Sequence, residues 1–352
     1  MNIEDIKIKN SKRMSNVIEF QNSIEKNNTK AKIIDTIHWK PNSVVCRIIN
    51  ILAFVLALVI SFVIPLKQDV TLKPYRIFLV VLIGYFILAN IASVFNQKIK
   101  ARVNHNAQFY SGVGILLIIW DLLTTRSNIL PLPFFPSFAQ IIQVMVEDYG
   151  TLIISTENSM RLLVIGFTIG LILGITTGVL IGWYRQWHYW IFPIIKIIGV
   201  IPATAWIPIV MFIFPSSFYA QIFLIVICVW FPVAFMTSAG IQNLPKSYFE
   251  AAKTLGAKDD FLVFKVAVPG AMPSIFIGIY TATGLSFATL VVSEMIGAKA
   301  GLGWYINWAK GWSNYAKVYA SIIIMAIVFS LIMAILFKVR DRVLIWQKGL
   351  LK

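Results

Sequence analysis

A series of long apolar segments constrains this chain more than any other feature. Each is close to the length of about 20 residues that a helix needs to cross a bilayer. The chain of 352 residues is 58% hydrophobic and only 13% charged, whereas globular proteins carry about 25% charged residues. A water-soluble fold is therefore excluded, and the predicted fold is all-α and polytopic. About eight transmembrane helices are predicted, at Ile48–Ile64, Ile77–Phe95, Phe109–Leu123, Leu162–Trp183, Trp190–Phe214, Phe218–Ala239, Met272–Ile296 and Val318–Phe337.

The basic residues predict the orientation of these helices. The net charge is +16, which in a membrane protein indicates basic cytoplasmic loops rather than nucleic-acid binding. With the amino terminus inside, most of the 31 Lys and Arg residues fall in the inner segments, so both termini are expected in the cytoplasm. Residues 1–43 then form a basic cytoplasmic tail, in which a solvated segment is favoured over lipid contact, and no secretory signal peptide is expected.

The polar stretch between the sixth and seventh predicted helices is typical of a docking element. Pro245 suits a helix start, and Gly256 suits the position just past a helix end. Asp259 and Asp260 favour the start of a second short helix, by capping and through the helix dipole. The apolar residues that share a face are Phe249, Ala252 and Leu255 on the first helix and Phe261, Phe264 and Val268 on the second. An exposed apolar face on a helical hairpin beside a membrane predicts a protein partner.

This stretch also resembles a known element. Glu250-Ala251-Ala252, then Gly256 and later Pro269, are similar to the cytoplasmic "EAA" coupling loop of binding-protein-dependent ABC importers. The resemblance implies that residues 241–271 sit in a cleft of a separate ATPase subunit. Small alanines allow close approach, Glu250 offers a charge, Gly256 makes the bend, and Leu255 completes the coupling set. The alternative is an ordinary amphipathic connector.

The fifth predicted helix contains Pro193, Pro202 and Pro208. Prolines break backbone hydrogen bonds, and at membrane depth this is tolerated only where protein or a hydrated cavity satisfies the freed groups. Broken helices are a common way to build a transport pathway. The run from Ile201 to Pro208 resembles the "iP-x-x-A-w-iP" segment of nitrate, sulfonate and taurine permeases, which usually continue to Phe-Gly, whereas here Phe214 is followed by Pro215-Ser216-Ser217. We predict that the path residues are Pro202, Thr204, Trp206 and Pro208. A kinked packing helix is the alternative.

The fourth predicted helix has glycine at every fourth position. The stripe consists of Gly166, Gly170, Gly174, Gly178 and Gly182. Small residues at this spacing let another helix approach the backbone closely. The sequence leaves two interpretations open, a seam at the translocation path or subunit interface and simple packing within the chain.

The end of the seventh predicted helix carries a carboxylate. Glu294, followed by Gly301 and Gly303, resembles the "aEm-x-ga…GLG" outer segment of the same permeases. A carboxylate near a helix end in a membrane is costly and is a functional candidate, with exposure at the interface as the alternative. Residues 132–137 resemble the family's "LPsP" segment, which precedes a periplasmic amphipathic helix, here expected from Phe138 to Tyr149.

Several chemical functions lack the residues they need. The sequence has no Gly-x-x-x-x-Gly-Lys-Ser/Thr phosphate loop and no His-Glu-x-x-His or nucleophile-elbow pattern. The two cysteines, Cys46 and Cys228, and three scattered histidines have no disulfide or metal spacing. We therefore predict no enzyme activity, no cofactor and no metal. Acids and histidines are rare in the predicted spans, which disfavours a proton-coupled carrier, but a stand-alone carrier or channel and a membrane scaffold remain alternatives.

The resemblance covers residues 109–352 and implies an ABC importer permease core with the MetI-like, type I importer fold. Residues 44–108, with two predicted transmembrane helices, lie outside it as an N-terminal extension. The implied assembly is a homodimer in the plasma (inner) membrane, with two ATPase copies, an extracytoplasmic substrate-binding protein and surrounding lipid, and no nucleic acid. The implied solute is a small anion such as nitrate, bicarbonate, taurine or another sulfonate, or a thiamine precursor by a related lineage, and the sequence does not choose among them.

Overall fold

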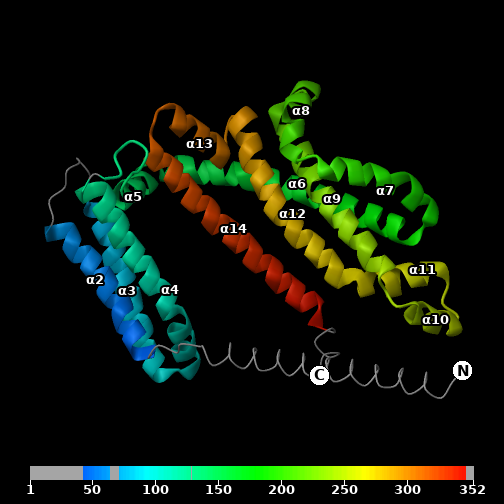
Figure 1. Ribbon diagram of the computed structural model, residues 1–352, viewed down its shortest axis with the longest axis horizontal. Helices are drawn as coiled ribbons and strands as arrows, with labels where there is room; N and C mark the ends of the chain where they lie inside the picture. Colours follow the sequence, from blue (N-terminus) through cyan, green and yellow to red (C-terminus); the bar gives the residue numbers. More distant parts are fainter. Residues whose placement is uncertain (1–42, 64–70, 128, 346–352) are drawn as a thin grey trace, which may run out of the picture. The chain divides into compact units, whose positions relative to one another are not determined.

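The computed structural model describes residues 43–63, 71–127 and 129–345. Every regular element within those ranges is a helix (Figure 1), so the all-α prediction is confirmed. The predicted tail lies outside the described residues, apart from Ser43. The chain divides into two compact units, residues 1–63 with 76–119 and residues 64–75 with 120–352, called below the N-terminal unit and the core unit.

The membrane-spanning helices agree closely in number with the prediction. Seven helical segments are long and apolar enough to cross a bilayer, and one bent pair of helices brings the number to eight if the pair is counted as one span. The seven segments are Val45–Val63, Lys73–Phe95, Ile99–Thr125, Tyr149–Trp183, Ser217–Gln242, Asp259–Gly297 and Tyr315–Val343.

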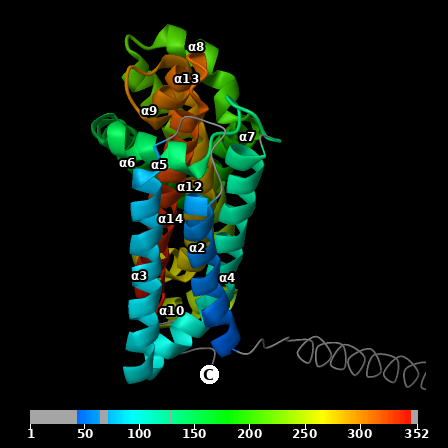
Figure 2. The same ribbon diagram turned by 90° about the vertical axis from the view of Figure 1, so that its left-hand side faces the viewer.

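The N-terminal unit contains three helices that run side by side (Figure 2). They are α2 (Ser43–Val63), α3 (Lys73–Phe95) and α4 (Gln97–Asp121). The Phe86 ring links them, with its centroid 5.2 Å from those of both Phe54 and Tyr110. Gly114 of α4 allows close contact with α2, because an added Cβ would lie 2.9 Å from the Cβ of Ala53. The predicted boundary between residues 108 and 109 therefore falls within α4, whose residues up to Ile119 group with α2 and α3.

The core unit begins with helices set by local capping. After η1 (Leu122–Arg126), α5 (Phe138–Glu147) starts at a capping box. The Gln140 N–H donates to Ser137 Oγ at 3.2 Å, and the Ser137 N–H donates to Gln140 Oε1 at 3.1 Å, so two backbone donors at the helix start are satisfied. The next helix, α6 (Tyr149–Trp183), has 35 residues and starts well before the predicted Leu162. At about 1.5 Å per residue it is roughly 52 Å long, more than the hydrocarbon core requires.

The fifth predicted span, Trp190–Phe214, is not one straight helix. It consists of α7 (Arg185–Val200), the short 3-10 turn η2 (Ala203–Trp206) and α8 (Ile207–Ile213), with a bend of 88°. Ile201 and Pro202 interrupt the helix with ψ angles of 119° and 135°. Pro202 lacks an N–H and disfavours helical geometry in the residue before it, so the break expected from the prolines is confirmed at this one.

The glycine stripe of α6 lies against α9 (Ser217–Gln242) of the same chain. A Cβ added to the five glycines would lie 2.6–3.0 Å from α9 side-chain carbons. The facing residues also recur every fourth position, at Ile225, Val229, Val233, Thr237 and Ile241. Of the two interpretations of the stripe, this geometry supports packing within the chain. We call the contact between α6 and α9 the seam; together with α12 (Val268–Gly297) it forms the centre of the core unit.

Candidate functional site

The predicted coupling loop begins with a helix whose end is defined by Gly256. This helix, α10 (Lys246–Thr254), has Pro245 at its N-cap. Gly256 has a φ of +82°, a conformation that glycine adopts without steric cost. The Gly256 N–H donates to the Lys253 carbonyl at 2.9 Å and the Ala257 N–H to the Ala252 carbonyl at 3.1 Å, which is the Schellman pattern. The bend predicted at this glycine is therefore present.

The second helix of the loop differs from the prediction. Asp259 and Asp260 begin α11 (Asp259–Phe261), but the N-cap is Lys258, and it makes no side-chain cap bond. The helix then continues through the π segment η3 (Leu262–Ala267) into α12, so no separate second helix exists. Pro269 lies in the first turn of α12, directly after the π segment, and the helix continues through it. The acidic residues keep their favourable place at a helix start.

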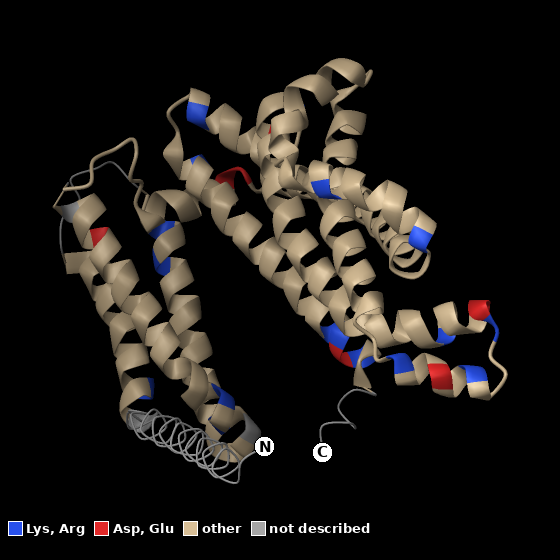
Figure 3. Ribbon diagram, turned by 45° about the vertical axis from the view of Figure 1, so that its right-hand side comes forward, with Lys and Arg blue, Asp and Glu red and all other residues tan. Residues whose placement is uncertain are grey.

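An exposed apolar surface covers this loop. It consists of Tyr248, Leu255, Phe261 and Phe264, and we call it the coupling surface. Leu255 is 90% exposed and Phe264 is 67% exposed, while charged residues lie along the same loop (Figure 3). Glu250 and Ala251 are exposed and Ala252 is half-buried. Phe249 does not join this surface, because its ring packs 5.5 Å from the Trp183 ring.

The break between α7 and η2 opens a cavity of about 380 Å³. Pro202 and Thr204 are in its lining, as predicted for path residues, and α9 and α12 supply the opposite wall through residues such as Cys228 and Thr289. Trp206 and Pro208 do not line it: Trp206 packs against the buried cluster around Ile207. No charged side chain is among the described residues of the lining, so a solute there would contact small, apolar and hydroxyl groups.

Glu294 lies in the interior rather than at the interface. Its side chain is 1% exposed, so the alternative of interfacial exposure is wrong. Ser159 Oγ of α6 donates to Oε1 at 2.7 Å, and the Gly303 N–H donates to Oε2 at 2.8 Å. Gly303 lies in the first turn of α13 (Leu302–Gly311), where a carboxylate is favoured by the helix dipole. Glu294 thus joins α6, α12 and α13, and a role in transport stays a prediction.

The two predicted outer glycines are explained by this contact. A Cβ on Gly301, which has a φ of +130°, would meet the carboxylate of Glu294 at 2.5 Å. A Cβ on Gly303 would lie 2.4 Å from the Val291 carbonyl oxygen. Both glycines therefore allow the start of α13 to approach the carboxylate.

Replacing Glu294 with alanine is expected to lower the free energy of unfolding by about 2–4 kcal/mol, because it leaves a buried N–H and hydroxyl unpaired and opens a cavity. Glu294→Gln should lower the free energy of unfolding by less, since the glutamine side chain keeps one acceptor oxygen. The control is Glu157→Ala, which removes an exposed carboxylate from α6. Thermal unfolding of the detergent-solubilised protein measures the effect, and equal losses in both alanine variants would contradict the contact.

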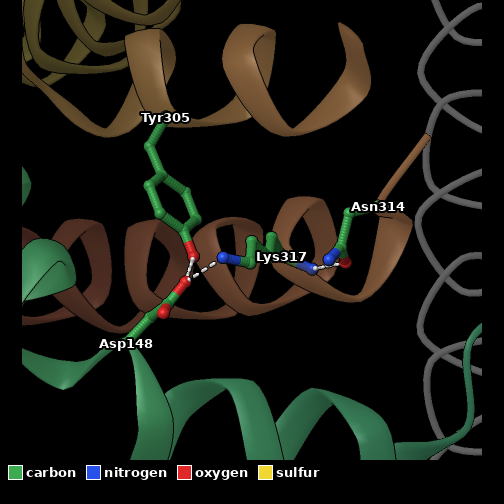
Figure 4. A network of polar contacts seen from close by, with 4 residues as sticks. All are labelled: Asp148, Tyr305, Asn314 and Lys317. Carbon is green, nitrogen blue, oxygen red and sulfur yellow. Dashed lines mark hydrogen bonds and ion pairs between the residues drawn. The ribbon is translucent and has the colours of Figure 1, made fainter. Parts of the chain in front are cut away.

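A polar network that sequence reasoning missed joins α6, α13 and α14 (Tyr315–Val343) (Figure 4). Asp148 precedes α6, and its Oδ2 accepts from Tyr305 Oη at 2.7 Å and lies 2.5 Å from Lys317 Nζ. Asn314 caps α14 by accepting from the Lys317 N–H at 3.3 Å. More than 150 residues separate Asp148 from its partners, and no local pattern connects them.

The network changes the ionisation of both acids in it. Burial opposes ionisation of Asp148, but the bonds from Lys317 and Tyr305 and the charge of Lys317 outweigh it, and the pKa of Asp148 is lowered. Burial, the hydrogen bond to Asp148 and the negative charge of Asp148 raise the pKa of Tyr305. At neutral pH the network therefore holds an ionised Asp148 and a neutral Tyr305.

This network predicts a pH dependence of stability. Because the pKa of Asp148 is lowered on folding, its contribution is present above the usual value of 3.8 and is lost as pH falls through the folded pKa. Asp148→Asn should lower the free energy of unfolding by no more than about 1 kcal/mol at pH 7, since the pair is partly exposed. The variant should also lack the loss of stability that Asp148 causes when the pH falls. Unfolding temperatures between pH 3 and 7 test it, with Glu147→Gln as a neighbouring control. An unchanged acid profile in Asp148→Asn would contradict the assignment.

Comparison with known proteins identifies the family. The family described as "Binding-protein-dependent transport system inner membrane component" matches residues 166–344, just over half of the chain. This chain belongs to that family. The matched region of this permease begins at the first glycine of the stripe and includes the α7–η2 cavity, the coupling surface, Glu294 and α14.

Curated relatives of the permease carry related names. A putative ABC transporter permease protein of Methanocaldococcus jannaschii is 31% identical over 200 residues, 55% of this chain and 74% of the relative. A nitrate import permease protein of Leptolyngbya laminosa is 32% identical over 198 residues, 54% and 71% of the two chains. A bicarbonate transport system permease protein of Synechococcus elongatus is 32% identical over 142 residues, 40% and 51% of the two chains. A solved inward-facing structure of the MetNI methionine ABC transporter is 20% identical, covers 56% of this chain and 98% of its own, and has a TM-score of 0.49.

Proposed function

We propose that this permease is the membrane-spanning subunit of an ATP-driven importer for a small anion of the nitrate or bicarbonate type. The names of the nitrate and bicarbonate relatives support this solute class. The neutral lining of the α7–η2 cavity is compatible with weak binding, which a conduit needs for release. Taurine and other sulfonates belong to the same chemical class and are the next candidates.

The coupling surface is the observation that carries the proposal. It exposes Leu255, Phe261 and Phe264 to solvent on a loop that carries the Glu250-Ala251-Ala252 pattern. Exposed apolar patches outside the membrane mark protein interaction sites. An ATPase subunit would cover this surface, with Glu250 pairing with a cation at its rim and Ala251 and Ala252 allowing close approach.

Movement of the loop would reach the membrane through α12. The helix runs without interruption from Asp259 to Gly297, so a displacement at the coupling surface would move the wall of the α7–η2 cavity, to which α12 contributes Leu285 and Thr289. Pro202 and Thr204 would line the path, and Trp206 and Pro208 would hold the shape of the break. Rigid helices moving as bodies are a common way to alternate access.

The complete assembly would contain two copies of this chain, two ATPase subunits and an extracytoplasmic binding protein. Both termini and the coupling surface would lie in the cytoplasm, as the distribution of basic residues predicts. The opposite side carries a cavity of about 430 Å³ between α5 and the start of α14, lined in part by Gln140, Glu147 and Asn314. The binding protein would deliver its solute on this side.

The bend at Gly256 offers a direct test. Gly256→Val should reduce uptake about tenfold or more, because a β-branched residue strains a φ of +82° and shifts the coupling surface by distorting the Schellman turn. Gly311→Val, at a glycine with nothing within 4 Å of an added Cβ, is the control. The measurements are uptake in membrane vesicles and co-purification of the ATPase. Unchanged uptake with the ATPase still bound would refute the coupling role.

A further inference from the structure

A cavity of about 220 Å³ with several polar residues in its wall lies between the three helices of the N-terminal unit. The polar groups of its lining are Asn50 from α2, Tyr85 and Asn90 from α3, and Arg102, Asn106 and Tyr110 from α4. On the same helices, apolar side chains such as Leu52 and Leu88 are more than 60% exposed. The unit therefore turns apolar residues outward and places polar side chains in the wall of an enclosed space.

The cavity lies at the membrane boundary. The three candidate spans of this unit begin or end at Val45, Phe95 and Ile99 on this side. Asn50 and Asn90 lie one to two turns inside those bounds, which is about 8 Å at 1.5 Å per residue. This depth is the outer part of the hydrocarbon core, directly beneath the headgroup and glycerol region of phospholipids.

The charge of the unit favours an anion in the cavity. Within residues 43–63 and 76–119 there is no Asp or Glu, so no described carboxylate of the unit neutralises Arg102. Arg47 adds positive charge near the same bounds. A guanidinium presents several N–H groups in a geometry that matches phosphate oxygens, and basic pockets between transmembrane helices bind anionic headgroups.

The wall of the cavity also contains a buried hydrogen-bond acceptor, the side-chain oxygen of Asn50. Asn50 is 3% exposed, and its Oδ1 has no hydrogen-bond partner among the described residues. Buried polar atoms are almost always paired in folded proteins, so a ligand with a hydroxyl or ammonium donor would complete this site. The ligand chemistry is thus a phosphate together with a hydrogen-bond donor.

We propose that this cavity binds the headgroup of an acidic phospholipid. Its phosphate would face Arg102, a headgroup hydroxyl would donate to Asn50 Oδ1, and its acyl chains would lie along the exposed apolar faces of α2 and α3. The site belongs to the part of the chain that precedes the matched family region, and it does not depend on the transported solute.

The test is native mass spectrometry of the full chain in detergent, titrated with phosphatidylglycerol or with phosphatidylcholine, which has no donor and no net charge. Phosphatidylglycerol should bind at least about tenfold more tightly, and Arg102→Gln should weaken its binding about tenfold. Lys100→Gln, a charge removal on α4 outside the cavity lining, should change it less than about twofold. Because Arg102 is exposed, the Arg102→Gln variant should fold normally. Its unfolding temperature checks this.

Three outcomes would overturn the proposal. The first is equal affinity for the two lipids, and the second is an equal loss in Arg102→Gln and Lys100→Gln. The third is competition by inorganic phosphate at the lipid's own concentration, which would assign the cavity to a soluble anion. Loss of binding in Asn106→Asp, which adds a negative charge to the cavity wall, would support it.

Discussion

Replacing Leu255 with aspartate is expected to reduce solute uptake at least about tenfold without lowering the amount of permease in the membrane. Leu255 is 90% exposed and follows the last residue of α10, so the isolated chain loses almost no contact. In the assembled importer the new carboxylate would be buried against the ATPase. An unpaired buried charge costs several kcal/mol, which is enough to weaken the docked state by more than tenfold.

The experiment compares Leu255→Asp with Ile345→Asp. Ile345 is also an exposed apolar residue, 62% exposed, and follows the last long helix outside the coupling surface. Co-purification of the ATPase and uptake should both fall in the first variant and stay near wild type in the second. Uptake at the wild-type level in Leu255→Asp, with normal amounts of permease, would show that this surface does not transmit the ATPase movement.

The second large effect is expected at the seam between α6 and α9. Gly170→Ala should lower the free energy of unfolding by about 1–3 kcal/mol, the usual cost of overpacking. The added Cβ would lie 2.8 Å from the Val229 Cβ and 2.9 Å from the Val226 carbonyl oxygen. A side-chain rotation moves neither atom, because the Val229 Cβ is bonded to the backbone and the Val226 oxygen is part of it, so relief requires the two helices to separate.

Gly284→Ala is the matched control for the seam. Gly284 is on α12, another core helix, and nothing lies within 4 Å of an added Cβ there. Alanine is favoured over glycine in a helix by up to about 1 kcal/mol, so this variant should be neutral or slightly more stable. Thermal unfolding and membrane accumulation measure both variants. If Gly170→Ala is as stable as Gly284→Ala, the helices do not approach as closely as the geometry requires.

The glycine stripe also shows how far sequence reasoning reaches. The spacing of four residues identified a close helix contact correctly, because it depends only on helix geometry. It left open whether the partner was another subunit or another helix of the chain. The structure shows that the partner is α9 of the same chain, whose facing residues also recur every fourth position. These residues, such as Ile225, Val229 and Val233, are common in membrane helices, and nothing in their sequence identifies them as the partner.

Glu294 and Phe249 illustrate the other kind of difference. A single carboxylate near a helix end was compatible with exposure, and its burial depends on Ser159, which lies 135 residues earlier. Phe249 and Leu255 share the same helical periodicity. The Phe249 ring packs on Trp183, whereas the Leu255 side chain is exposed to solvent. Periodicity identifies which residues share a face but not how much of that face a neighbouring helix covers.

The sequence by itself determined the class of protein, the approximate number and places of the membrane-spanning helices, the break at Pro202 and the turn at Gly256. These follow from local physics: a bilayer requires apolar helices of a given length, proline lacks an N–H, and glycine accepts a positive φ. Only the tertiary structure decided which helix fills the glycine stripe, which side chains form the coupling surface, and how Asp148 and Glu294 are paired. Those contacts join residues far apart in the chain, where packing between helices rather than local preference sets the lowest free energy.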